Sequence, residues 1–336
     1  MFWRSWKSAP PDAGEDDPQA EPAAAGAEGI EDAEDTAEPP AFPPPLPAQV
    51  QFFGRPHPRT GKPRGLPEVD EPVPDTVLDQ ADFDGLTVRA ASIRGDDHRW
   101  YGKPRQDSMG FWALPRAGAE DVLVACVADG VGSEQLSHVG SMLACRLLRR
   151  ELAAYAEGAE GAVDLGDDAD LPDLGQRICD RVRLGMLEHA EVLGPDPRAL
   201  STTLVGAVIE LAPPGRPRRC VLLRVGDSSA YLLRDGAFRD CLADPHGEET
   251  IVSSATAALP TGPAAVEVAE VAIGNDDVLL LCSDGLANPM RGPEVQEKLV
   301  DYWSGPIPGA LEFGWQLSFR AKSYGDDRTA ICVWGR

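Results

Sequence analysis

The sequence lacks the cysteine and histidine spacing of a zinc site or of a disulfide framework. It contains seven cysteines and five histidines in 336 residues, without any C-x-x-C pair. Most of the cysteines fall in apolar stretches, so we interpret them as buried thiols in a reducing compartment and expect a cytoplasmic protein. The N-terminus has no apolar run of signal-peptide length, and we expect neither secretion nor a transmembrane segment.

Positive charge is also scarce. The chain has 31 Lys and Arg against 55 Asp and Glu, which gives a formal net charge of −24. This balance argues against binding to nucleic acid or to an anionic membrane, because both are polyanions. A phosphorylated substrate would be repelled at long range too, so cations close to the site must offset that repulsion.

The first 81 residues lack the apolar periodicity of a folded domain. Eleven acids and no Lys or Arg lie between Asp12 and Glu38, and the adjoining stretch AEPPAFPPPLPAQV favours polyproline II. Such a composition cannot bury enough surface to offset its ordering entropy. We therefore expect residues 1–81 to be a disordered acidic and proline-rich region, and residues 82–336 to form one folded domain.

Short apolar runs that end in aspartate recur through the folded part. Val122–Ala128, VLVACVA, is rich in β-branched residues and predicts a buried strand that stops at Asp129. An Asp-Gly pair after one strand is most often only a turn. Here, however, four more aspartates lie at the ends of apolar stretches: Asp107, Asp227, Asp284 and Asp326.

These strand-end carboxylates point to metal chemistry. A carboxylate at the edge of a core is costly unless it is paired or bound to a cation, and few Lys or Arg stand beside these positions. Several such carboxylates predict a site for hard divalent cations, which prefer oxygen ligands.

Six motifs in order resemble the metal-dependent type 2C serine/threonine protein phosphatases, in a bacterial-like variant. They are QDS (106–108), ADGVG (128–132), STTL (201–204), VGDSSAYLL (225–233), CSDGL (282–286) and GDDRT (325–329). The order of strands and helices predicts a β layer covered by helices on both faces. The resemblance sharpens this to an α+β fold, an α/β/β/α sandwich of two antiparallel sheets flanked by helices.

The resemblance also implies the ligands of two ions, Mn²⁺ or Mg²⁺. Asp129 is expected to bridge both ions and to be the catalytic centre. Asp107 and the Gly130 carbonyl would hold one ion, and Asp284 and Asp326 the other. Relatives with a third ion make that an open alternative here.

Two further acids receive roles from the resemblance. Asp227, together with Asp284, would hold the third ion. Asp327 is expected to support the site by orienting Asp326 or a metal-bound water.

The phosphate-binding residue is left open. The family usually has an arginine in a G-x-x-R pattern before an acidic pair, but here His98 stands at that position and Gln106 replaces the customary Glu. His98 could donate a hydrogen bond to phosphate, or it could be an ordinary loop histidine. A fork-shaped clamp could come instead from a nearby arginine: Arg94, Arg99 or Arg105.

The implied function is hydrolysis of phosphoserine and phosphothreonine in proteins through a metal-activated water. Phosphorylated proteins and a cognate Ser/Thr kinase would be the partners. A different class is the alternative: a weak or inactive pseudophosphatase that binds phosphoproteins or acts as a scaffold. The retained aspartates favour turnover, and the altered phosphate-binding loop favours the alternative. Hydrolysis of a small phosphorylated metabolite at the same site is a third hypothesis.

Overall fold

The computed structural model describes residues 47, 50–54, 67, 69, 73–83, 85–116, 120–156, 170–213, 215–242, 258–262 and 266–336. All of them belong to the unit Leu46–Arg336. The acidic stretch between Asp12 and Glu38 lies outside the described residues, so the disorder expected there stays a prediction.

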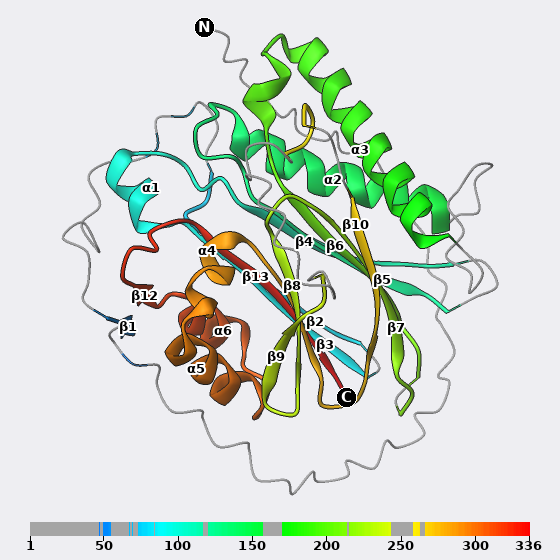
Figure 1. The fold of residues 1–336 in the computed structure, drawn as a ribbon, viewed down its shortest axis with the longest axis vertical. Coiled ribbons are helices and arrows are strands. Elements are labelled where there is room, and N and C mark those ends of the chain that lie inside the picture. Colours follow the sequence, from blue (N-terminus) through cyan, green and yellow to red (C-terminus); the bar gives the residue numbers. More distant parts are fainter. Residues whose placement is uncertain are drawn as a thin grey trace, which may run out of the picture. The chain divides into compact units, whose positions relative to one another are not determined.

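Two antiparallel sheets form the centre of the fold (Figure 1). The first consists, in order of paired neighbours, of β10 (Glu267–Ile273), β7 (Arg218–Val225), β6 (Leu204–Glu210), β5 (Val122–Ala128) and β4 (Ser108–Leu114). The second consists of β2 (Thr76–Phe83), β3 (Leu86–Ile93), β13 (Arg328–Gly335), β11 (Val278–Cys282), β8 (Ser229–Arg234) and β9 (Ala237–Asp240). A short parallel pair joins β1 (Phe52–Phe53) to β12 (Arg320–Ala321).

Helices cover the outer face of each sheet (Figure 1). The first sheet is covered by α2 (Ser137–Ala156) and α3 (Leu171–Leu193). The second is covered by α4 (Asp284–Ala287), α5 (Pro293–Trp303) and α6 (Ala310–Leu317). Shorter elements are α1 (Asp96–Tyr101) and the 3-10 turns η1 (Pro197–Leu200) and η3 (Pro289–Arg291). The predicted α/β/β/α sandwich is confirmed.

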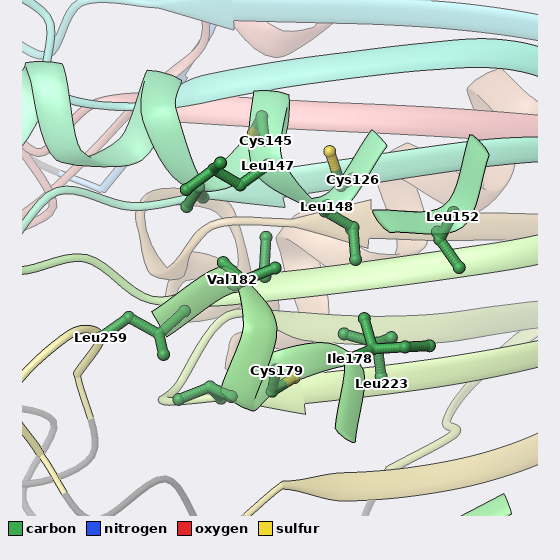
Figure 2. Close-up of a cluster of buried hydrophobic side chains, with 14 of the residues drawn as sticks. Cys126, Cys145, Leu147, Leu148, Leu152, Ile178, Cys179, Val182, Leu223 and Leu259 are labelled. Carbon is green, nitrogen blue, oxygen red and sulfur yellow. The ribbon is translucent and has the colours of Figure 1, made fainter. Parts of the chain in front are cut away.

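The central strand β5 shows why its sequence is apolar without a break. Leu123, Ala125 and Val127 point into the core between the two sheets. Their neighbours along the strand face the other way, into the core under the helices. A strand buried on both faces needs no polar alternation. Figure 2 shows the helix-side cluster, which contains Cys126 of β5, Leu148 and Leu152 of α2, Ile178 and Val182 of α3, and Leu223 of β7.

The folded sheet starts earlier than the sequence predicts. The expected boundary at residue 82 falls inside β2, which pairs along its whole length with β3. β2 is an edge strand and none of its residues is fully buried. Its sequence TVLDQADF is therefore half polar, and apolar periodicity does not reveal it. Among the described residues, no helix is long and apolar enough to cross a bilayer.

A close helix contact gives a first stability prediction. A Cβ added at Gly140 of α2 would lie 2.0 Å from the carbonyl oxygen of Leu200 in η1. We expect Gly140→Ala to lower the free energy of unfolding by about 1–3 kcal/mol, because the backbone must shift. This holds although alanine is the better helix former. Urea unfolding measures the change.

The matched control is Gly305→Ala, where a Cβ would meet nothing within 4 Å. Its unfolding midpoint should equal that of the wild type. A Gly140→Ala protein as stable as this control would contradict the close approach of α2 and η1.

Candidate metal centre

Five strand-end aspartates from both sheets converge at one site. Asp107 precedes β4, Asp129 follows β5, and Asp227 lies between β7 and β8. Asp284 follows β11, and Asp326 stands just before β13. The other four carboxylates all lie close enough to Asp129 to raise the pKa of its carboxyl group. The structure thus brings together the aspartates that the sequence singled out.

The cluster is electrostatically unfavourable without counter-charge. Burial, followed by the charges of Asp107 and Asp284, raises the pKa of Asp129 well above its ordinary value. Burial and then Asp327 raise the pKa of Asp107 to about 7. Burial and then Asp326 raise the pKa of Asp284 to about 6. A bound cation would reverse this penalty, because it favours the ionised carboxylates.

The donor atoms fit a hard divalent cation. Among the described residues, no N–H or alcohol group donates to the buried Oδ1 atom of Asp284, whose neighbour is the acidic side chain of Asp129. Its Oδ2 accepts a bond of 3.2 Å from Asn288 Nδ2. A buried carboxylate oxygen without a donor is costly unless a cation reaches it. The cluster offers oxygen atoms alone, which is the ligand type preferred by Mg²⁺ and accepted by Mn²⁺.

Hydroxyl groups fix the backbone that carries Asp129. The Asp129 carbonyl accepts from Thr203 N (2.8 Å) and Thr202 Oγ1 (2.9 Å). Asp129 N donates to Thr203 Oγ1 (3.0 Å), which is 2.7 Å from Ser228 Oγ. Gly130 is packed so closely that an added Cβ would lie 2.8 Å from the Gln106 carbonyl. These contacts to Asp129 are not evident from the sequence, although the residues stand inside the STTL and VGDSSAYLL motifs.

The hydroxyl group of Ser283 positions the Asp107 carboxylate. Ser283 Oγ donates to Asp107 Oδ2 at 2.6 Å, and the Asp107 side chain is buried. Ser283 also accepts from Thr329 N at 3.1 Å. Ser283 therefore connects the carboxylate of the first sheet to β13 of the second.

Asp327 is the buried anchor of the site. Its carboxylate accepts from Gly95 N (2.7 Å), Gln106 N (2.5 Å) and His98 Nδ1 (2.8 Å). Its own N–H donates to Asp326 Oδ1 at 2.8 Å. Asp327 thus contacts Asp326 through its backbone, while its side chain holds residues 94–107, which we call the Arg94–Asp107 segment. Burial would raise the pKa of Asp327, but the hydrogen bond from His98 and its charge outweigh burial and lower it.

His98 belongs to the same buried network. It lies in α1, with Nδ1 on Asp327 and Nε2 3.6 Å from Asp326. Burial alone would lower the pKa of His98, but the bond to Asp327 and the charges of both aspartates raise it. Ligand atoms of these three residues lie within 4.8 Å of one another, a geometry that could also hold a metal ion. Because the Asp327 carboxylate already accepts hydrogen bonds from His98 and from three backbone N–H groups, we interpret the trio as an ion-pair network.

The three candidate arginines are engaged with the protein itself. Arg94 Nη2 donates to the His98 carbonyl (3.0 Å), and Arg99 donates twice to Asp75 (3.1 and 2.6 Å). Arg105 donates to Ser92 Oγ (2.7 Å) and to the Pro74 and Asp107 carbonyls. Their guanidinium groups hold the Arg94–Asp107 segment in place. A phosphate clamp made by one of them stays a prediction.

Comparisons with known proteins agree with this geometry. The sequence profile of the family described as Protein phosphatase 2C matches residues 94–307, more than half of the chain. The serine/threonine phosphatase stp of Listeria innocua is 27% identical over 198 residues, which cover 52% of this chain and 71% of that protein. The serine/threonine protein phosphatase PstP of Mycobacterium tuberculosis is 27% identical over 247 residues, 66% of this chain and 42% of that protein.

Solved structures share the fold. The serine/threonine phosphatase Stp1 of Staphylococcus aureus has a TM-score of 0.52 at 18% identity, covering 77% of this chain and 100% of that chain. A bacterial serine phosphatase also has a TM-score of 0.52 at 18% identity, covering 74% and 97%. At this identity the likeness concerns the fold alone.

The acidic cluster predicts an unusual pH dependence of stability. A carboxyl group whose pKa is higher in the folded than in the unfolded state binds its proton more tightly when folded, so it destabilises the protein as pH rises. Because the ordinary pKa of Asp is 3.8, this loss begins at about pH 4 and continues up to about 6 for Asp284 and about 7 for Asp107. We expect the melting temperature in EDTA to fall by several degrees across that range.

Saturating Mn²⁺ should remove most of the fall, because the metal replaces the protons. Differential scanning fluorimetry at a series of pH values, with EDTA and with Mn²⁺, measures both curves. A melting temperature in EDTA that stays level or rises up to pH 7.5 would count against the cluster.

The Asp327 anchor gives a third prediction. Asp327→Asn leaves the His98 imidazolium without its buried partner, so we expect the free energy of unfolding to drop by about 3–5 kcal/mol. The pKa of His98 should fall toward or below its ordinary value, as measured by NMR titration of the imidazole. Asp235→Asn, the same charge change in an exposed turn, should change neither quantity. An unaltered His98 titration would show that Asp327 does not hold it.

Proposed function

The chain belongs to the Protein phosphatase 2C family, and we propose that it hydrolyses phosphoserine and phosphothreonine esters of proteins in a metal-dependent reaction. Membership of this family confirms the resemblance seen in the six motifs. One observation carries the proposal: four aspartates from both sheets converge on Asp129, and within the described part of the chain no N–H or alcohol group donates to the buried Oδ1 of Asp284. Such a cluster of carboxylates is suited to binding divalent cations.

The ligand assignment is part of the proposal. Asp129, Asp107 and the Gly130 carbonyl would hold one ion, and Asp129, Asp284 and Asp326 would hold the other. When bound, Mn²⁺ or Mg²⁺ lowers the pKa of a water molecule and neutralises charge on phosphoryl oxygens. No covalent intermediate with the protein is required.

The remaining residues hold these ligands. Ser283 orients Asp107, and the pair of threonines Thr202 and Thr203 fixes the Asp129 backbone. The Asp327 N–H orients Asp326. Asp227, with Asp284, is the proposed pair for a third ion. Each of these contacts stabilises a ligand position before the cation arrives, which reduces the reorganisation needed for binding.

The cellular setting belongs to the proposal too. The relatives named above are serine/threonine phosphatases, which supports phosphorylated proteins as substrates and a cognate Ser/Thr kinase as the opposing enzyme. Six of the seven cysteines are buried and all seven are free thiols. That pattern supports a reducing, cytoplasmic environment.

A second candidate function is a pseudophosphatase that binds phosphoproteins without turnover. The observation that favours it is the state of the Arg94–Asp107 segment, in which Arg94, Arg99 and Arg105 all donate to protein groups. Retention of the five aspartates favours turnover, because a binding module needs no such set.

The decisive test replaces Asp129. We expect Asp129→Asn to reduce turnover of a phosphothreonine peptide by roughly a hundredfold or more, because the bridging carboxylate is lost. Its melting temperature should be kept or raised, because one member of a repulsive cluster becomes neutral. Assays with Mn²⁺, with Mg²⁺ and with EDTA, on the peptide and on p-nitrophenyl phosphate, measure the effect.

Asp276→Asn is the control, since Asp276 lies in a turn with a positive φ of 66° that asparagine tolerates. It should be as active as the wild type. A wild-type protein that melts cooperatively and binds Mn²⁺ but turns over neither substrate would favour the pseudophosphatase instead.

A further inference from the structure

The acidic cluster poses a problem for any phosphorylated ligand. A phosphate monoester carries close to two negative charges at neutral pH, and the chain has a net charge of −24. Bound divalent cations offset the carboxylates that hold them, but an approaching phosphopeptide still needs a cation at the rim. The Arg94–Asp107 segment lies beside the cluster and contains four Lys or Arg residues: Arg94, Arg99, Lys103 and Arg105.

Lys103 differs from the three arginines of this segment. Arg94 and Arg105 are buried, and Arg99 donates two hydrogen bonds to the Asp75 carboxylate. Lys103 is exposed, and its Nζ donates to the Gly132 carbonyl at 2.6 Å. Within the described chain this is the one hydrogen bond of its side chain, so two of its three N–H groups can still bind an acceptor.

The ammonium group is held beside the cluster. Gly132 belongs to the ADGVG turn that begins with Asp129. At the other end, Lys103 N donates to the His98 carbonyl at 2.9 Å, and Gly102, with a φ of 70°, ends α1 directly before it. The Lys103 backbone therefore depends on the same α1 that Asp327 anchors through His98. A flexible side chain so fixed loses less entropy on binding an anion than a free one.

An open cavity of about 920 Å³ lies in front of Lys103. Gln106, Gly132 and Ser133 also line it. Gln106 is 4% exposed, and none of the residues that the structure describes donates a hydrogen bond to its buried side-chain oxygen. A Cβ added at Gly132 would lie 3.7 Å from that oxygen. The Gln106 amide therefore faces the cavity and needs a partner there.

The Lys103 ammonium and the Gln106 side-chain oxygen would bind different chemical groups of one ligand. The Lys103 ammonium needs an anion, and the buried Gln106 oxygen needs a donor such as a peptide N–H. A phosphorylated peptide carries both, whereas p-nitrophenyl phosphate has the anion but no N–H or alcohol group that could donate to Gln106. The cavity is also far larger than a phosphate group requires, and it is open enough for an extended chain.

We propose that Lys103 binds the phosphate group of a phosphopeptide seated in this cavity, and that the Gln106 amide binds the peptide backbone beside it. The inference rests on the proposed function, because it names the substrate contacts of that same site. Lys103 is then a substrate-binding residue for the phosphate group, the Gln106 amide supplies the preference for phosphopeptides over small phosphates, and neither side chain is a proposed metal ligand.

The experiment uses the full chain and three variants: Lys103→Ala, Lys103→Arg and the control Lys298→Ala, which removes a lysine from the surface of α5. One readout is kcat and KM with Mn²⁺ on a phosphothreonine peptide and on p-nitrophenyl phosphate. The second is fluorescence anisotropy of a labelled peptide that carries a non-hydrolysable difluoromethylene phosphonate. Calorimetric titration with Mn²⁺ reports metal affinity for each variant.

For Lys103→Ala we expect phosphonate-peptide affinity to fall by roughly tenfold or more, as for the loss of a charge-assisted hydrogen bond. KM for the peptide should rise by a similar factor with kcat little changed, because the contact forms on substrate binding. Lys103→Arg should restore most of the affinity, and Lys298→Ala and all Mn²⁺ affinities should match the wild type. KM for p-nitrophenyl phosphate should rise as well, because that substrate carries the same phosphate group.

The outcomes separate this inference from the proposed function. Turnover by the wild type with Lys103→Ala unaffected in KM and in peptide affinity would overturn the Lys103 site and leave the phosphatase standing. Peptide binding that depends on Lys103 in a protein without turnover would support the site and overturn hydrolysis. Failure of the wild type to bind the phosphonate peptide would overturn the binding of phosphopeptides in this cavity.

Discussion

The site depends on one buried carboxylate that is not itself a proposed metal ligand. Asp327 stands where β13 of the second sheet begins, and it accepts hydrogen bonds from Gly95, His98 and Gln106 of the segment that leads into β4 of the first sheet. Bonds to a charged group contribute about 1.5–3 kcal/mol each. Through these bonds the ends of the two sheets are tied to each other, and the aspartates they carry are kept at a fixed spacing.

Two neighbouring carboxylates show how environment sets chemistry. Asp327 has donors on its oxygens and a depressed pKa, whereas Asp107 has a pKa raised to about 7 although it is just as buried. Asp107 accepts hydrogen bonds from the side chains of Ser283 and Thr329 and lies among other acids. The charge of Asp327 is stabilised by hydrogen-bond donors of the protein. The charge of Asp107 is compensated only when a proton or a cation binds. A metal-binding site needs both kinds of carboxylate, one that holds the surrounding backbone and one that binds the cation.

Much of this was readable from the sequence, because the core strands are apolar runs that stop at aspartate. VLVACVA followed by Asp129 defines both the central strand and the centre of the cluster. β2 was missed because an edge strand with polar residues has no strong periodicity. The roles of Arg99 and His98 were also out of reach, since their partners Asp75 and Asp327 lie 24 and 229 residues away. Position in a motif shows where such a residue stands, but only its contacts show what it does.

The position of β13 has a consequence for how the protein is made. This strand is among the last segments of the described sequence, yet it lies in the interior of its sheet, between β3 and β11. Until Arg328–Gly335 has left the ribosome, two strands separated by about 185 residues cannot be joined through it, and Asp326 and Asp327 are missing from the site. The nascent chain must therefore wait in a partly folded form, with strand edges exposed, and become competent for metal only after synthesis of this domain is complete.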